Sequence, residues 1–235
     1  MGMSGDSIGE LRRVANWLAP LVLAAAFLVQ PYVADWSDEA EISRKVAAAS
    51  TRELTANLLG IIYCAVGILA IMAVVGHLRE RGESRWSVWS ATALTPGFVL
   101  LAAHFALFAG RALVIRNGID SAAAFGEEAY TDMTGVIGGI LVTLGFIALA
   151  VGGSRGGLLS RMQAQLVVAG TVVAFVGAAL DPGWADWIAW VGTAVIFWTL
   201  AAALSSAKAP ATEVIPARGV AREHGRRRRE MDLGV

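Results

Sequence analysis

Residues 54–78, LTANLLGIIYCAVGILAIMAVVGHL, contain no Asp, Glu, Lys or Arg. The hydrocarbon layer of a bilayer is about 30 Å thick and a helix rises about 1.5 Å per residue, so about 20 apolar residues cross it. This segment is therefore long enough and apolar enough to be a transmembrane helix. Its residues Gly60, Cys64 and Gly67 recur at helical spacing, which favours close contact with another helix inside the membrane.

Further apolar runs lie on both sides of this segment. The six runs together are Val14 to Val33, Leu54 to Leu78, Val88 to Val114, Met133 to Gly152, Ala164 to Leu180 and Ala185 to Ala207. The turn signal Asp181-Pro182-Gly183 separates the last two, which therefore form a tight helical hairpin. Gly135-xxx-Gly139 and Gly170-xxx-Ala174 give further small-residue faces for helix packing. The sequence predicts an all-α, polytopic membrane protein, a bundle of six transmembrane helices.

The composition agrees with a membrane protein. The chain has 235 residues, of which 56% are hydrophobic and 16% charged, and its mean hydropathy is +0.60. A soluble domain carries about 25% charged residues, so a water-soluble globule and a disordered chain are both excluded. With the single cysteine Cys64, the chain can form neither an internal disulfide nor a cysteine-based zinc site.

Three regions follow from these runs. Residues 1–13 are a cytoplasmic N-terminus, residues 14–207 the transmembrane domain, and residues 208–235 a disordered basic cytoplasmic tail. Arg12-Arg13 could open a twin-arginine export signal, but the following run is long and shows no cleavage site near Gln30-Pro31, so we expect a retained first span. The tail ends in a basic cluster that attracts anionic lipid and that we do not expect to bind nucleic acid: Arg226, Arg227, Arg228 and Arg229.

The distribution of basic residues predicts that both termini lie in the cytoplasm of a cell whose inner membrane holds the protein. With termini inside, 14 of the 19 Lys and Arg residues and 8 of the 19 Asp and Glu residues are cytoplasmic. Without the tail the Lys and Arg ratio is 7 to 5 in the same direction. Lys and Arg near span ends resist translocation, which favours this orientation. The outer loop 34–52 is acidic, and a short interfacial helix is expected around Glu39 to Ala49.

Aromatic residues fall where an interface belt requires them. Trp17, Trp86 and Trp89 lie at the predicted inner boundary, and Tyr32, Trp36, Trp184 and Trp187 at the outer one. Amphipathic rings prefer the headgroup level, so we interpret these residues as anchors. Trp190 and Trp198, which lie deeper in the last run, are predicted to be packing residues.

His104 is the ionisable side chain that could carry chemistry within a span. An ionisable residue there is by default a functional-site hypothesis. His104 and Arg111 share a helical face, and Asn57 and Glu53 lie in the same outer half. Asp132 and Asp181 flank that half, which makes an outward-opening polar pocket above His104 geometrically possible. Phe108, one turn outward, counts against it because its ring would stand between His104 and the mouth.

A packing role explains the same residues. A neutral histidine can donate to a neighbouring helix, and Arg111 can extend to the headgroups. No metal site and no cofactor are expected, because His77 and His104 fall in opposite leaflets and cannot share a haem. The glycine-rich stretch Gly152 to Gly157 lacks the features of a phosphate loop and is expected to be a flexible cytoplasmic connection.

The order of elements resembles an uncharacterised family of small six-span bacterial membrane proteins. The shared layout is a long first outer loop, a second span closed by a basic turn (His77 to Arg85), a short Arg/Gly loop (Gly152 to Arg161) and a final hairpin. The resemblance covers most of residues 10 to 207. It implies no known activity, substrate or catalytic residue.

Two functions therefore stand open at this point. A third, ion or solute transport, is less favoured, because no span other than the third shows a charge carrier or a clear helix break in mid-membrane. The first is a non-enzymatic structural or partner-binding module whose partner is another protein or a second copy of the chain. The second is a membrane-embedded enzyme or a carrier of lipid or a small molecule. In that case His104 would be the catalytic acid or base, and Asn57, Arg111, Asp132 and Asp181 would bind the ligand.

Overall fold

The computed structural model describes residues 5–34, 39–118, 129–180 and 182–207. Within these ranges every regular element is a helix. The helices are α1 (Gly5–Val29), α2 (Glu39–Ala48), α3 (Ser50–Glu80), α4 (Ser84–Arg116), α6 (Ala129–Arg155), α7 (Arg161–Ala178) and α8 (Ala185–Ser206). The short helix expected in the first outer loop is confirmed by α2.

Five of these helices are long and apolar enough to cross a membrane: α3, α4, α6 from Met133 onward, α7 and α8. The apolar part of α1, Val14–Val29, is shorter. At 1.5 Å per residue it spans about 24 Å, less than the hydrocarbon layer. The described residues thus confirm an all-helical chain with five candidate spans. The apolar part of α1 is too short to count as a sixth candidate span.

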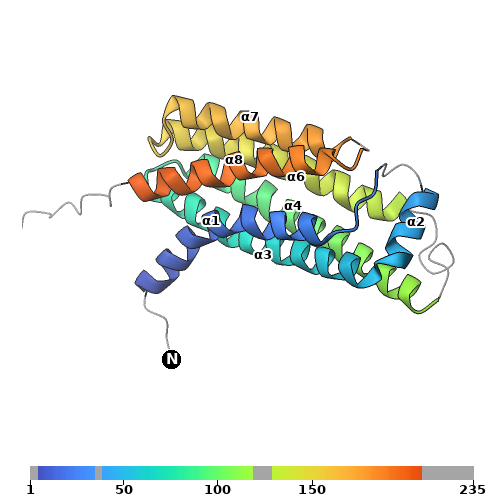
Figure 1. Cartoon of the computed structure of the whole chain (residues 1–235). Coiled ribbons are helices and arrows are strands. Elements are labelled where there is room, and N and C mark those ends of the chain that lie inside the picture. Colours follow the sequence, from blue (N-terminus) through green and yellow to red (C-terminus); the bar gives the residue numbers. More distant parts are fainter. Residues whose placement is uncertain (1–4, 35–38, 119–128, 181, 208–235) are drawn as a thin grey trace, which may run out of the picture.

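The long helices form a closed ring in chain order. α1 packs along α3, α3 along α4, α4 along α6, α6 along α7 and α7 along α8, and α8 returns to α1. Figure 1 shows these helices lying side by side along one axis, with α2 across one end. We call this end, where α1 ends and α8 begins, the α2 end. Because each neighbour along the chain is also a neighbour in space, short connections suffice.

Glycines permit the close helix contacts of the ring. A Cβ on Gly60 would meet the Phe105 ring at 2.6 Å, and one on Gly170 would meet the carbonyl oxygen of Gly192 at 2.8 Å. These contacts follow the small-residue faces expected in α3 and α7. In α6 only part of the expected face is used: a Cβ on Gly135 would lie 2.9 Å from His104 Nδ1 of α4, whereas one on Gly139 would meet nothing within 4 Å. Gly138 faces α4 instead, where a Cβ would lie 3.0 Å from the Gly97 oxygen.

Four aromatic side chains, one from each of four helices, fill the space at the centre of the helical bundle. They are Tyr63 of α3, Phe98 of α4, Phe146 of α6 and Phe197 of α8. Phe197 lies 5.7 Å from Phe146 and 6.3 Å from Tyr63 between ring centroids, and both pairs meet edge to face. All four residues are buried, with Phe98 and Phe197 fully so. Edge-to-face packing adds to the dispersion energy of such a core, which ties α3, α4, α6 and α8 together.

The loops at the end opposite the α2 end are hydrogen-bonded to each other. The Arg81 guanidinium donates from Nη1 to the carbonyl oxygens of Gly156 and Gly157, at 3.2 and 2.9 Å. Gly157 has a φ of +64°, a conformation that glycine adopts at no steric cost. Arg155 lies over the Trp86 ring, 5.5 Å from its centroid. The stretch expected to be a flexible connection is therefore a defined turn, held by a side chain from another loop.

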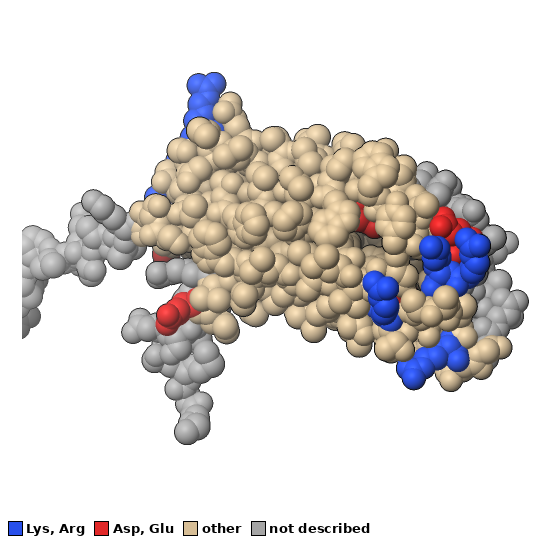
Figure 2. Space-filling model, viewed as in Figure 1, with Lys and Arg blue, Asp and Glu red and all other residues tan. Residues whose placement is uncertain are grey.

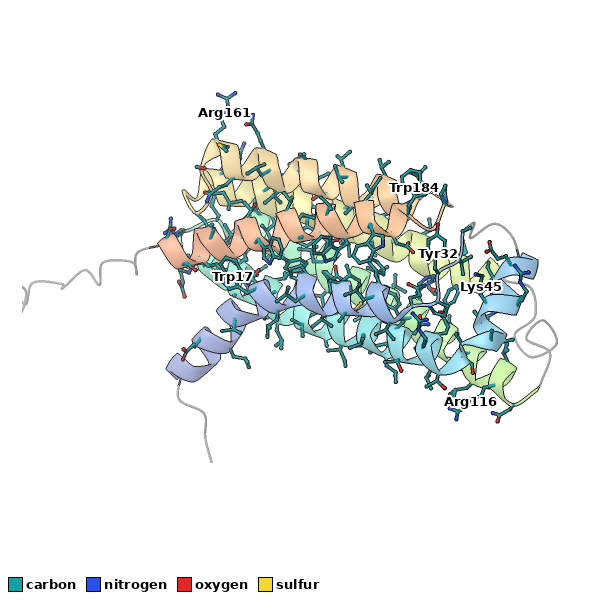
Figure 3. All side chains as sticks on the ribbon, viewed as in Figure 1. Trp17, Tyr32, Lys45, Arg116, Arg161 and Trp184 are labelled. Atoms are coloured by element: carbon teal, nitrogen blue, oxygen red, sulfur yellow. The ribbon has the colours of Figure 1, made fainter. Side chains whose placement is uncertain are left out.

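Charged and aromatic residues mark the two ends of the bundle. Figure 2 shows blue and red atoms mainly toward the ends and a tan surface between them. In Figure 3, Tyr32, Trp184, Lys45 and Arg116 lie toward the α2 end, and Trp17 and Arg161 toward the opposite end. Trp17, Tyr32 and Trp184 are exposed at 46%, 62% and 54%. This arrangement is the one expected of interface anchors.

Candidate functional site

A polar cluster lies inside the α2 end of the bundle and begins with two residues of α3. Glu53 and Asn57 are one helical turn apart and both are buried. The Asn57 amide Nδ2 donates to the Glu53 backbone oxygen at 2.9 Å and to its Oε1 at 2.7 Å. The spacing of four residues places the two side chains on one face, so this bond is local to α3.

The second carboxylate oxygen of Glu53 is the unusual atom of the cluster. Glu53 is 3% exposed, and its Oε2 accepts no hydrogen bond from any described residue. Two further charges act on this carboxylate: Arg111 of α4 attracts it, and Asp186 of α8 repels it. A buried carboxylate with an unsatisfied oxygen costs free energy unless a partner, a proton or a ligand compensates it. The cluster is therefore where polar chemistry is concentrated among the buried residues.

His104 lies at a different contact, between α4 and α6. A Cβ on Gly135 of α6 would meet His104 Nδ1 at 2.9 Å, so the imidazole packs on this glycine. Its ring centroid is 4.7 Å from that of Phe108 and 5.9 Å from that of Phe105. Phe105, one residue along, faces Gly60 of α3 instead. These contacts match the packing role more closely than a position on the floor of a pocket.

The structure thus brings together only part of the predicted set. Asn57 and Arg111 both lie near Glu53. Asp132 belongs to the first turn of α6, but its side chain lies outside the described residues, as does all of Asp181. Sequence reasoning placed Glu53 in the outer half without choosing it as a candidate. The Glu53–Asn57 spacing was the signal that could have singled it out.

Asp186 was missed for a different reason. It stands in the first turn of α8, where an acidic residue is favourable in any helix, so the sequence alone gives it no special meaning. In the structure Asp186 lines a small cavity between α1 and α8, with a volume of about 50 Å³. Phe27, Tyr32 and Trp187 form its aromatic walls, and Gln30 lies at its edge.

The backbone around this cavity is fixed by contacts between segments far apart in the sequence. The Gly183 N–H donates to the Ala34 oxygen at 3.0 Å, and Gly183 lies so close to the Val33 carbonyl that no side chain could fit there. The Arg52 side chain donates from Nε to the Val29 oxygen at 2.9 Å and from Nη2 to the Gln30 oxygen at 3.5 Å. Arg52 thereby satisfies carbonyl groups at the end of α1.

The chemical capacity of this region is limited by its size. Pockets for drug-sized molecules measure about 300–1,000 Å³. A cavity of about 50 Å³ holds a few waters or one small charged group. Across the described part of the chain, no group of three His, Cys, Asp or Glu side chains could hold a metal ion.

Comparisons with known proteins add no functional information. No protein-family model, curated protein or solved structure matches the chain.

Proposed function

We propose that the protein is an inner-membrane protein with six spans, in which α1 is the sixth. Figure 1 shows α1 running beside α3 and α8 toward the α2 end. Two side-chain hydrogen bonds join α1 to its neighbours: Asn16 Nδ2 donates to the Ala70 oxygen at 3.2 Å, and Trp190 Nε1 donates to the Pro20 oxygen at 2.8 Å. Beyond α1, the side chain of Val33 is buried in a cluster with Ile42, Val46 and Ala112. These contacts support α1 as part of the membrane-spanning bundle despite its short apolar segment.

In this proposal the α2 end faces outward and both termini are cytoplasmic. The inner end then carries the Arg81 and Arg155 contacts together with the tail. The bias against translocating Lys and Arg near span ends favours that orientation, and the basic run Arg226 to Arg229 is drawn to anionic lipid of the inner leaflet.

Cysteine labelling in intact cells tests the orientation. Cys64 is buried at 1% exposure and should not react with a membrane-impermeant thiol reagent, so the native chain is a silent background. We expect Ala122→Cys to be labelled in intact cells and Ala211→Cys only after the cells are opened. Labelling of Ala211→Cys but not Ala122→Cys in intact cells would invert the topology. Labelling of both would mean that the three helices between these positions, α6, α7 and α8, do not each cross the membrane.

The role that the structure supports best is a non-enzymatic structural or partner-binding module, with another protein or a second copy as partner. The observation that carries this proposal is the aromatic cluster of Tyr63, Phe98, Phe146 and Phe197. These rings occupy the middle of the helical ring, where a carrier or channel would need a path for its solute. A densely packed centre supports a rigid scaffold that presents its surface and loops to a partner.

A second candidate is a membrane-embedded enzyme or a carrier of lipid or a small molecule. The specific observation in its favour is Glu53, whose buried Oε2 accepts no hydrogen bond from the described residues and lies in the field of Arg111. A buried ionisable group next to a charged partner is a candidate for a functional site. His104 remains the candidate acid or base in this alternative.

Complementation of a strain lacking the gene separates the two candidates. If the role is structural, neither side chain is catalytic. Growth of strains that carry Glu53→Gln or His104→Gln should then follow the stability of each variant, measured as its Tm in detergent. Glu80→Gln is the matched control, because the Glu80 side chain is 58% exposed at the opposite end of α3. Loss of growth by Glu53→Gln or His104→Gln at unchanged Tm and expression would contradict the structural role and support the second candidate.

A further inference from the structure

The cavity between α1 and α8 differs from an ordinary packing defect in what surrounds it. Its walls are the rings of Phe27, Tyr32 and Trp187, and the carboxylate of Asp186 lines it as well. Aromatic faces attract cations through the negative face of the ring, and a carboxylate beside them adds a direct charge. Figure 2 shows red atoms recessed in the tan surface near the α2 end of the bundle.

The cavity is preorganised. Phe27 and Trp187 meet edge to face, with centroids 6.1 Å apart at 69°. One turn deeper, Trp190 holds α8 to α1 through its bond to the Pro20 oxygen, and it packs against Trp187 at 6.1 Å. The Gly183–Ala34 hydrogen bond closes the other side. A site whose walls are fixed before binding loses little entropy when it is filled.

A positive side chain stands at the border of this cavity. Arg52 binds the carbonyl oxygen of Gln30, which borders the cavity, and is itself exposed. Its Nε and Nη2 are used on Val29 and Gln30, and Nη1 has no hydrogen bond to the described residues. A carboxylate in the cavity and a guanidinium at its border fit a ligand that carries both charges: a cation in the cavity and an anionic group at Arg52.

We propose that this cavity binds the ammonium group of a phospholipid headgroup of the phosphatidylethanolamine type, with the headgroup phosphate at Arg52. The position supports a lipid, because the exposed side chains of Tyr32 and Trp184 mark the headgroup level at this end. A primary ammonium is favoured over a trimethylammonium group, because its N–H groups can donate hydrogen bonds to the Asp186 carboxylate that lines the cavity. This inference rests on the proposed membrane position but not on which side of the membrane the α2 end faces.

Native mass spectrometry of the full chain, released from nanodiscs of defined lipid, tests the proposal. We expect retention of phosphatidylethanolamine over phosphatidylglycerol and phosphatidylcholine. Asp186→Asn should weaken this retention by about tenfold or more, since it removes one partner of a charge-assisted contact. Trp187→Ala and Arg52→Gln should also reduce it. Equal retention of the three lipids by the native chain overturns the proposal.

The matched controls lie at the same end of the bundle and do not line the cavity. Trp184→Ala removes another exposed tryptophan of the same turn, and Arg116→Gln another exposed cation at the same end, so both should keep the preference. Tm measurements show that each variant is folded, and Trp187→Ala tests the walls even if Asp186→Asn destabilises the start of α8. Displacement of the lipid by free ethanolamine at equal concentration would assign the site to a soluble amine and overturn the lipid proposal. Nanodiscs contain both leaflets, so an inverted topology leaves this readout unchanged.

Discussion

Gly192→Val is expected to lower the free energy of unfolding by about 3 kcal/mol or more, because it forces α7 and α8 apart. A Cβ on Gly192 would collide with the backbone nitrogen of Ala174 and the backbone oxygen of Gly170, and would lie 2.8 Å from the Ala174 Cα. Backbone atoms cannot rotate away, so a whole helix must move. In detergent this loss corresponds to a Tm lower by roughly 10 °C, which thermal size-exclusion chromatography can measure.

The control for this substitution is Gly139→Ala in α6. A Cβ there would meet nothing within 4 Å. Because alanine also favours a helix more than glycine does, the Tm should stay unchanged or rise slightly. A Gly192→Val protein as stable as Gly139→Ala would show that α7 and α8 do not pack as described.

Phe197→Ala should destabilise the bundle by about 3 kcal/mol, since it leaves a cavity among Tyr63, Phe98 and Phe146. In a membrane the lost ring is not transferred to water, so the loss comes from the cavity and the missing contacts rather than from hydrophobic burial. Phe197 is fully buried, whereas Phe175 of α7 is 42% exposed. Phe175→Ala is therefore the matched control, with an expected change within about 0.5 kcal/mol.

Equal Tm values for Phe197→Ala and Phe175→Ala would mean that the centre of the helical bundle tolerates an empty space. That result would also remove the main argument for a scaffold rather than a carrier, because the aromatic cluster is what fills the path between the helices.

The helical class was predictable because apolar runs of membrane length leave few alternatives. Length, hydropathy and the Glu39 to Ala49 segment were enough to place the long helices and α2. The face that each helix turns toward its neighbours was harder to predict. Gly135-xxx-Gly139 matched a packing pattern, but Gly138 faces α4 and Gly139 faces away, because the rotation of a helix depends on all its neighbours. The spacing of glycines in the sequence does not show which of two adjacent residues, Gly138 or Gly139, faces the neighbouring helix.

The candidate site was harder to predict than the helices. His104 was predicted as a candidate because it is an ionisable residue within a span. In the structure its ring packs on Gly135. The roles inferred for Asp186 and Arg52 depend on neighbours on α1, Phe27 and Val29 respectively, more than 20 residues away along the chain. The turn at Gly156 and Gly157 was likewise defined by Arg81, more than 70 residues earlier. Long-range contacts of this kind leave no periodicity in a single sequence.

The closed ring has a consequence for the order of assembly. As the chain is synthesised, α3 can pack on α1, and α4, α6, α7 and α8 can each pack on the long helix before it as soon as it is inserted, since consecutive long helices are neighbours in the ring. The α1–α8 contact is the exception, because it joins the first helix to the last and must wait for the whole chain. Phe27 and Trp187 therefore meet only at the final step. The cavity between them exists only in a completed protein, and a chain truncated before α8 would lack it even if its other helices had inserted correctly.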